Sequence, residues 1–435
     1  TAILFSANNC VDFPVNITTF NITFANNAVP LAGDLYLMNI SNAENVMIDS
    51  HYIYNNDFSQ GCYIYSVINN NTQNVNIKIT NLDVELNVND AADRFSFLTA
   101  TDLTLNSFVL ENLTYVQNAL AGRLISIGAA VWYHPGEVTP PHYNNMSNLY
   151  IFNNSAYDTS ILFFDTMSSN LNALPNFTPM LESFAMVINN LTVQSNTFLK
   201  GKNSLWLYQV GLFQGIGTQF YVNSSIISNN YFEYYDAFLI EQQVASVFLQ
   251  NVTVKENCLN SSHLINTYYS MVSISGGDFL DQRNRSMIAT YRFAVISRSI
   301  FDDNLVSGES MFVFDNAFLI INENNFTNMI FDGGEFIEGG DYAPPPLTLY
   351  ADQYRRDLAY EAMTLSIDPI IWKAFNESYE RIYEDSSNIV YYYTIYDNYF
   401  INFTSNVEII WFQDYDFQQS MIYIFRNHFE NFELS

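Results

Sequence analysis

Apolar and polar residues alternate along this chain in short segments that recur at a nearly fixed interval. Two consecutive segments show the pattern best, because they align without a gap at an offset of 25 residues. The first runs through Phe293–Phe301 and Met311–Phe314, and the second through Phe318–Phe326 and Phe336–Gly339. Such a period predicts a solenoid of similar stacked coils.

A six-residue signature marks each repeat: an apolar residue, two variable residues, usually Asn, one variable residue and usually Phe. It occurs twelve times, eight times with Asn in fourth place, at intervals of 20–34 residues through the array 193–321. Copies begin at Ile53, Ile79, Leu110, Ile151, Val193, Ile227, Val254, Ile274, Ile296, Ile321, Ile395 and Ile424. Asn suits such a bend because it tolerates left-handed backbone and hydrogen bonds to nearby peptide groups.

Short alternating segments flank each signature and favour β-strands joined by Asn-rich bends. The predicted fold is therefore all-β: a single-stranded parallel β-helix of about twelve coils, roughly 55–60 Å long, with a small helical insertion. Fourth-position asparagines stacked in successive coils are predicted to hydrogen bond to one another as a ladder. Its members would be Asn56, Asn154, Asn196, Asn230, Asn257, Asn324, Asn398 and Asn427.

The repeats divide the chain into four parts. Residues 1–34 precede them and are expected to form an N-terminal cap or a strand that adds to another molecule. Residues 35–340 form the solenoid, which is interrupted by insertions at 116–147 and 157–185. Residues 341–387 form an arm that opens with Pro344–Pro346 and then adopts helical periodicity. This arm is expected to fold onto the solenoid or to dock a neighbouring molecule, and residues 388–435 supply the final coils.

The signature and the predicted ladder resemble the right-handed parallel β-helix superfamily, the pectin-lyase-like fold, over about residues 35–340 and 388–435. Enzymes of that family cleave acidic polysaccharides, so the resemblance implies a search for their motifs. Asp302-Asp303 follows one signature, but the His-Gly and Arg-Ile-Lys motifs of the hydrolases are absent from the sequence. The resemblance thus implies a fold and, on these motifs, a non-catalytic member.

Charged residues are unusually few in this chain. Only 14% of residues are charged, against roughly 25% in an average soluble domain, and the net charge is −29. This charge disfavours nucleic acid as a partner. The chain contains no apolar run long enough for a membrane span and starts at Thr1 without a signal-peptide pattern, which suggests a processed or partial product.

Acceptor sequences for N-linked glycans, Asn-x-Ser/Thr, are about twice as frequent as composition predicts by chance. They indicate a secreted, extracellular or cell-surface protein whose glycans supply the hydrophilicity that charges do not. The sixteen acceptors are Asn16, Asn21, Asn39, Asn70, Asn112, Asn145, Asn153, Asn176, Asn190, Asn223, Asn251, Asn260, Asn284, Asn325, Asn376 and Asn402.

Three cysteines are too few for a disulfide framework. Cys10 and Cys62 are predicted to bridge the N-terminal segment to the first coils, and Cys258 to fill a core position as a small apolar residue. No residues have the spacing of a metal site, and among the histidines only His134 and His142 share a loop. We therefore predict no cofactor besides glycans.

Two pairs of carboxylates are candidates for catalysis or for calcium binding. Asp302 and Asp303, or Asp414 and Asp416, are placed to act as acid and base or to bind Ca²⁺, although at bends such residues more often only solvate the turn. Two functional classes follow. The favoured one is a structural glycoprotein that assembles with itself, head to tail, into a filament or coat. The alternative is a carbohydrate-active or carbohydrate-binding protein.

Overall fold

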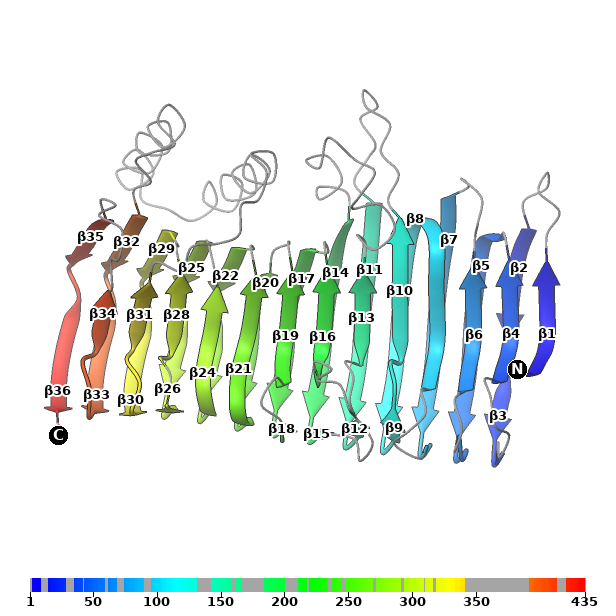
Figure 1. The fold of residues 1–435 in the computed structure, drawn as a ribbon, viewed down its shortest axis with the longest axis horizontal. Coiled ribbons are helices and arrows are strands. Elements are labelled where there is room, and N and C mark those ends of the chain that lie inside the picture. The colour runs from blue at the N-terminus through cyan, green and yellow to red at the C-terminus, as the bar shows by residue number, and fades with distance from the viewer. Residues whose placement is uncertain are drawn as a thin grey trace, which may run out of the picture.

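The described residues of the computed structural model form strands stacked side by side along one rod (Figure 1). These residues are 2–8, 15–28, 35–41, 43–58, 62–68, 74–89, 95–130, 142–157, 161–165, 184–199, 210–216, 219–233, 237–243, 247–268, 271–290, 293–308, 310–315, 318–340, 391–412 and 420–434. All their regular elements are β-strands. The predicted helical arm, 341–387, lies outside the described residues.

Each coil begins with two longer strands on two faces of the rod. The first face consists of β1 (Ala2–Asn8), β4 (Leu35–Ser41), β6 (Cys62–Ile68), the start of β8 (Phe95–Val116), β10 (Ile125–Ala130), β13 (Leu162–Asp165), β16 (Val210–Ile216), β19 (Ala237–Gln243), the ends of β21 (Cys258–Tyr268) and β24 (Arg283–Thr290), β28 (Phe312–Asp315), β31 (Ile337–Gly340) and β34 (Ile410–Phe412). The second face consists of β2 (Val15–Phe20), β5 (Ala43–Tyr54), β7 (Asn74–Glu85), the middle of β8, β11 (His142–Phe152), β14 (Phe184–Gln194), β17 (Gln219–Ser228), β20 (Val247–Lys255), β22 (Met271–Ser275), β25 (Phe293–Ser297), β29 (Phe318–Asn322), β32 (Tyr391–Tyr396) and β35 (Ser420–Phe425).

Two shorter segments complete each coil. The third face is made by β3 (Thr23–Ala25), the ends of β5, β7, β8, β11, β14, β17 and β20, then β23 (Asp278–Leu280), β26 (Ile300–Asp302) and the starts of β30 (Asn325–Asp332), β33 (Tyr399–Ser405) and β36 (His428–Leu434). The fourth is made by β9 (Ala119–Ala121), β12 (Ser155–Tyr157), β15 (Thr197–Leu199), β18 (Tyr231–Phe232), the starts of β21 and β24, β27 (Leu305–Ser307) and the ends of β30, β33 and β36.

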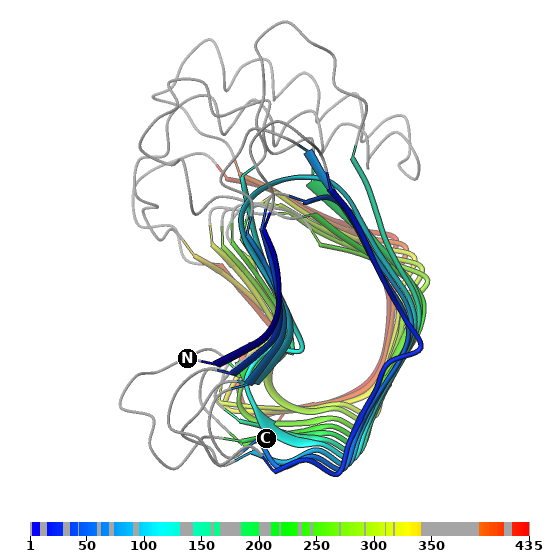
Figure 2. The same cartoon turned by 90° about the vertical axis from the view of Figure 1, so that its right-hand side faces the viewer.

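Every strand pairs in parallel with the equivalent strand one coil along. In β11, for example, Met146 lies opposite Leu110 of β8 and Ile188 of β14. Seen along the axis of the rod, the coils superimpose (Figure 2). The predicted parallel β-helix solenoid is therefore confirmed as the fold.

Two left-handed residues, five positions apart, turn each coil between its second, third and fourth faces. The described residues contain thirteen such pairs, so the stack has thirteen coils and a length of about 58 Å at 4.8 Å per coil. The pairs are Asn21/Asn26, Ser50/Asn55, Asn81/Leu86, Asn112/Gln117, Asn148/Asn153, Asn190/Ser195, Ser224/Asn229, Asn251/Glu256, Gly276/Asp281, Arg298/Asp303, Glu323/Asn328, Asp397/Asn402 and Arg426/Asn431. We call the first member of each pair bend 1 and the second bend 2.

The additional coil is formed by residues 2–28, which the sequence assigned to a separate N-terminal segment. Here β1 pairs with β4, and both β2 and β3 pair with β5, all in parallel. The segment is thus continuous with the solenoid. Likewise, β9, β10 and β13 belong to the coils, although the sequence placed them in insertions.

The six-residue signature marks bend 1 in some coils and bend 2 in others. Its third residue is always the left-handed one, for example Asn55 at bend 2 and Glu323 at bend 1. The fourth residue points inward at the ladder position, and the sixth is an inward residue of the following strand. A sequence scan finds the motif at either bend without distinguishing them, which explains intervals as short as 20 residues.

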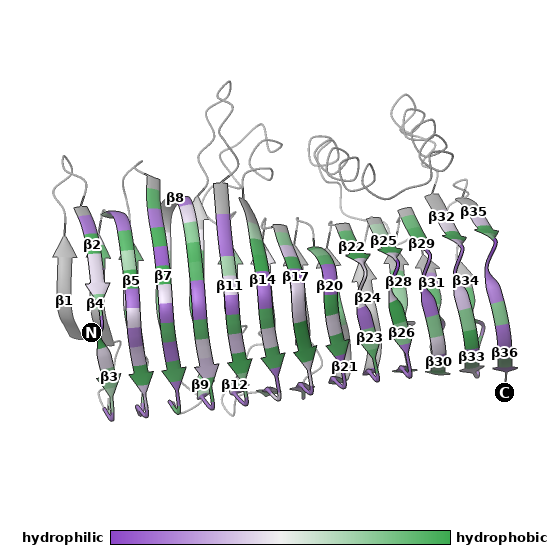
Figure 3. Ribbon diagram, turned by 180° about the vertical axis from the view of Figure 1, so that it is seen from behind, coloured by the Kyte–Doolittle hydropathy of each residue, from purple (hydrophilic) through white to green (hydrophobic). Residues whose placement is uncertain are grey.

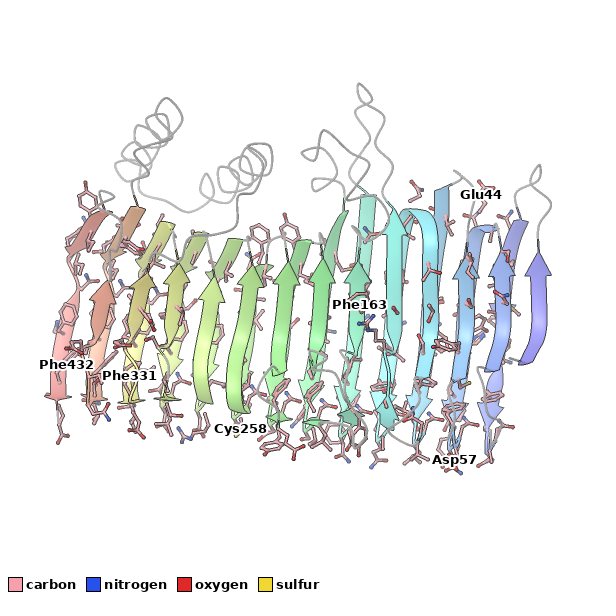
Figure 4. The ribbon with its side chains drawn as sticks, in the orientation of Figure 1. Glu44, Asp57, Phe163, Cys258, Phe331 and Phe432 are labelled. Atoms are coloured by element: carbon pink, nitrogen blue, oxygen red, sulfur yellow. The ribbon has the colours of Figure 1, made fainter. Side chains whose placement is uncertain are left out.

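Alternation along the strands produces a dry interior, and Figure 3 shows hydrophobic and hydrophilic residues alternating along them. Phenylalanines at equivalent inward positions stack face to face through five coils, with ring centroids 4.8–5.1 Å apart, in the column Phe279, Phe301, Phe326, Phe400 and Phe429. A second column near the C-terminal end joins Phe331, Phe403 and Phe432 (Figure 4). Such stacking fixes the register of each coil on the next.

Candidate functional site

The outer surface at the bends is the main candidate site, because the predicted glycan acceptors gather there. Eight acceptors have exposed side chains: Asn16, Asn21, Asn112, Asn153, Asn190, Asn251, Asn325 and Asn402. Asn39, Asn145 and Asn223 are half-buried. The backbones of Asn260 and Asn284 lie in β21 and β24, whereas Asn70, Asn176 and Asn376 lie outside the described residues.

Six of the exposed acceptors occupy left-handed bend positions: Asn21, Asn112, Asn190 and Asn251 at bend 1, and Asn153 and Asn402 at bend 2. The geometry explains the sequence pattern. At Asn112 the side chain points outward, Leu113 points into the core, and Thr114 returns to the surface. A bend asparagine followed by inward and outward residues therefore matches Asn-x-Thr whenever the outward residue is Thr. The coil itself accounts for part of the excess of acceptors.

Asparagines at the bends also hydrogen bond along the outside of the rod. At bend 1, Asn81 Nδ2 donates to Asp49 Oδ1 at 2.9 Å, and Asn112 Nδ2 donates to Asn81 Oδ1 at 2.9 Å. Asn148 then donates to Asn112 at 3.0 Å, and Asn190 to Asn148 at 2.8 Å. This row of four asparagines is the bend 1 outer ladder.

A matching row lies at bend 2 near the C-terminal end. Asn328 Nδ2 donates to Asp302 Oδ1 at 2.9 Å, Asn402 donates to Asn328 at 2.9 Å, and Asn431 donates to Asn402 at 3.0 Å. These three asparagines form the bend 2 outer ladder. Neither outer ladder was predicted from the sequence, since the predicted ladder involves only the fourth position of the signature.

The asparagines predicted to form one internal ladder belong to two. Asn56, Asn154, Asn196, Asn230 and Asn257 follow bend 2, in a row that also contains Asn27, Asn87, Asn118 and Gln282. Asn324, Asn398 and Asn427 follow bend 1. The signature lies at bend 2 in the coils of the first group and at bend 1 in those of the second, so its fourth residue belongs to a different ladder in each group. Asn87 and Asn118 were missed, although their 31-residue spacing from Asn56 was a usable signal.

Cys62, the predicted disulfide partner of Cys10, carries a free thiol in the structure, and Cys10 lies outside the described residues. The Cys62 side chain is fully buried, and this burial raises its thiol pKa to about 12. Cys258 is half-buried between the inward residues Asn257 and Leu259, at the edge of the rod labelled in Figure 4, so it does not fill the core as expected.

The predicted acid–base or calcium pair Asp302 and Asp303 stabilises a bend. Asp302 Oδ1 accepts hydrogen bonds from Thr327 Oγ1 at 2.6 Å and Asn328 Nδ2 at 2.9 Å, and Asp303 is the left-handed residue. Asp414 and Asp416 lie outside the described residues. Within the part of the chain that the structure describes, no three His, Cys, Asp or Glu side chains are grouped to hold a metal ion.

One carboxylate pair does converge on a single hydroxyl. The buried Ser310 Oγ lies 2.5 Å from Glu335 Oε2 and 2.9 Å from Glu338 Oε2. The two Oε2 atoms are therefore at most about 5.4 Å apart. A hydroxyl donates only one hydrogen, so Ser310 can donate to one of the two carboxylates at a time. Both glutamates are half-buried.

Among the histidines, His51 has an internal structural position. It is buried next to bend 1, with Nδ1 2.9 Å from the Asp49 carbonyl oxygen and Nε2 2.6 Å from Tyr65 Oη. Desolvation lowers its pKa from the ordinary value. His134 lies outside the described residues.

Comparison with known proteins identifies no family for this chain. No protein-family model matches the chain, and no curated protein matches it. A solved structure that it resembles is a mannuronic acid-specific polysaccharide lyase of family 6 from human gut microbiota. That match has 9% identity and a TM-score of 0.19, and covers 84% of this chain and 100% of the lyase. A TM-score this low supports no functional argument. No helix of the described residues is long and apolar enough to cross a membrane.

Proposed function

We propose that this protein is a structural, N-glycosylated rod of the extracellular space or cell surface. The observation that carries the proposal is the placement of the acceptors: none of those with described side chains is buried, and they follow the outside of the rod from Asn16 to Asn402. Glycans attached there would cover an outer surface on which charged residues are sparse.

Site-by-site glycopeptide mass spectrometry of the chain made in a eukaryotic secretory host tests this proposal. We expect sugars on most of the eight exposed acceptors. Electron microscopy of the same material should show rods whose thirteen-coil stack is about 58 Å long. A secreted, folded chain without sugar at any acceptor would overturn the glycoprotein assignment.

We further propose that one molecule joins the next head to tail through the thirteenth coil. Its inward side chains Ile422, Ile424 and Phe429 are 44%, 46% and 51% exposed. The equivalent residues one coil earlier, Tyr393, Ile395 and Phe400, are 4%, 0% and 1% exposed. Within the described residues, β35 and β36 pair on one side only, and an apolar coil face of this kind favours addition of a further coil.

The first coil of a second copy would match this face only in part. Stacked in register, its Phe24 and Ile17 would meet Phe429 and Ile422. At the bends, however, Asn427 would face Ile22, and Phe432 would face Asn27. Neither internal ladder therefore continues from one copy into the next. At least one amide would be buried without a hydrogen-bond partner, at a cost of about 1–3 kcal/mol. We expect a reversible association that is weaker than the contact between two internal coils.

Sedimentation across a concentration series tests the end contact. We expect Ile424→Asp to shift the chain to monomer and Ile226→Asp to leave association unchanged. Ile226 is a matched control, since it is also an isoleucine with 46% exposure but lies on the outer third face of the seventh coil. Monomer at high concentration for the unsubstituted chain would contradict the head-to-tail proposal without touching the glycoprotein assignment.

A carbohydrate-active function is the second candidate, favoured by the convergence of Glu335 and Glu338 on Ser310. Such a pair is suited to general acid and base catalysis at a glycosidic bond. Pectin, alginate and related acidic polymers are the substrates to screen. Activity lost in both Glu335→Gln and Glu338→Gln, but kept in Asp302→Asn, would support this candidate over the structural one.

A further inference from the structure

Asn112, Asn190 and Asn402 each combine three properties. Each is a left-handed bend residue, a glycan acceptor, and a member of an outer ladder. Asn112 and Asn402 both donate to the preceding coil and accept from the following one. The Nδ2 atom that would carry a glycan is therefore the same atom that donates the ladder hydrogen bond.

We propose that these three asparagines carry N-linked glycans and keep their ladder hydrogen bonds, so that the ladder fixes the direction in which the first sugar leaves the rod. This inference rests on the proposed glycoprotein function and specifies how its surface is built.

The chemistry leaves one hydrogen for the ladder. In glycosylation the side-chain Nδ2 forms a bond to C1 of a lipid-linked sugar diphosphate, the bond from C1 to the diphosphate breaks, and Nδ2 releases one proton. The amide nitrogen has two hydrogens before the reaction and one after it. The modified side chain can therefore still donate once.

Amide geometry decides which hydrogen remains. The product is a secondary amide, for which the trans form is strongly favoured over the cis form. In the trans form the remaining N–H points away from the C=O, as in a peptide bond. A side chain whose N–H and C=O point in opposite directions can donate to one coil and accept from the other, as Asn112 does between Asn81 and Asn148. The sugar then occupies the other amide position, to the side of the ladder.

Spacing along the ladders also leaves room for sugars. In the bend 1 outer ladder, acceptors alternate with non-acceptors: Asn81 and Asn148 are followed two residues later by Asp83 and Tyr150, whereas Asn112 and Asn190 are followed by Thr114 and Thr192. The bend 2 outer ladder alternates likewise, with Asn402 between Asn328 and Asn431. Glycan-bearing amides in one ladder are thus two coils, about 9.6 Å, apart.

Exposed Tyr150 lies in register between Thr114 and Thr192. Its ring stacks on Phe152, with centroids 5.7 Å apart, and the exposed part of the ring can pack against a sugar on either neighbouring coil.

Two variants, each made in two hosts, separate the effect of the glycan on Asn112 from the effect of its ladder hydrogen bonds on stability. Thr114→Val destroys the acceptor and keeps Asn112, whereas Asn112→Ala removes both the acceptor and the ladder hydrogen bonds. Each is made in a eukaryotic secretory host and in the bacterial cytoplasm, where the chain receives no N-linked sugar. We expect Thr114→Val to lose the glycan with Tm unchanged. Asn112→Ala should lower Tm by about 1–2 °C in both hosts and speed hydrogen exchange in residues 108–118.

The decisive comparison is between glycosylated and bacterially made unsubstituted chains. Equal exchange protection of residues 108–118 in the two, with sugar on Asn112, is the expected result. Faster exchange in the glycosylated chain would mean that the sugar breaks the ladder, and would overturn this inference alone. Sugar on Asn21, Asn153 and Asn325 but not on the three ladder acceptors would do the same. Absence of sugar at every acceptor would instead overturn the proposed function.

Discussion

Asn196 Oδ1 accepts two hydrogen bonds from Asn154, one from its backbone N–H at 3.0 Å and one from its side-chain Nδ2 at 2.9 Å. Asn196 in turn donates to Asn230 Oδ1 at 3.0 Å. Both asparagines are almost fully buried. Each amide thus satisfies its neighbour, and the ladder places polar groups in an apolar interior without leaving donors or acceptors unpaired.

Replacing one internal rung should therefore cost more than the loss of one hydrogen bond. In Asn196→Leu the volume is nearly kept, but the Asn154 N–H loses its acceptor, Asn196 Oδ1, and the Ile151 carbonyl oxygen loses its donor, Asn196 Nδ2, inside the core. We expect the free energy of unfolding to fall by about 2–5 kcal/mol, measured by denaturant titration. The exposed Asn106→Leu serves as control, with a change of no more than about 0.5 kcal/mol. Equal effects of the two would contradict the role given to the ladder.

The period of the sequence predicts the solenoid because inward and outward residues alternate and the bends require left-handed backbone. Bend 1 and bend 2 have the same sequence pattern, since both combine a left-handed residue with an inward neighbour. Asn87 and Asn118 were missed for this reason, and Asn324 was joined to the wrong row. The outer ladders were not predicted, because the hydrogen bonds between Asn112, Asn81 and Asn148 depend on which residues of successive coils lie opposite one another. The local pattern of apolar and polar residues does not define that register.

Left-handed residues other than Asn and Gly mark positions where stability can be gained. Leu86 has φ of 56° at bend 2, a conformation that costs an ordinary L-residue about 1 kcal/mol. We expect Leu86→Asn to raise the free energy of unfolding by about 0.5–1 kcal/mol in chemical denaturation. Val88→Asn, two residues away and outside the left-handed region, should bring no gain. A similar gain from both would assign the effect to lost surface hydrophobicity instead.

His51 makes the first coils sensitive to acid. Desolvation lowers its pKa, so the unfolded chain binds a proton at a higher pH than the folded chain does. The stability contributed by neutral His51 is therefore complete above the unfolded pKa, near 6.5, and is lost as the pH falls below it.

His51→Leu isolates this contribution, because Leu82 already occupies the equivalent position in the next coil. We expect the difference in unfolding free energy between the original chain and the variant to shift in favour of the variant as the pH is lowered from 7.5 to 5.5. The comparison removes the general effect of acid on a chain of net charge −29. A difference that is constant over this range would show that His51 does not titrate on unfolding.

Among the described glycines with positive φ, Gly122 is the one whose replacement should damage the stack most. It has φ of 136°, and a Cβ there would lie 2.1 Å from the carbonyl oxygen and 2.4 Å from the nitrogen of Phe95, both backbone atoms of the neighbouring strand β8. No rotamer change can relieve such a contact, so the two coils must separate locally. Gly308 offers the matched comparison, since it also has a positive φ, 82°, but a Cβ there meets nothing within 4 Å. We expect Gly308→Ala to cost about 1 kcal/mol, the strain of the backbone alone, and Gly122→Ala about 3 kcal/mol or more. Denaturant unfolding of the two variants measures the difference directly, and equal losses would show that the coils at Phe95 move apart at little cost.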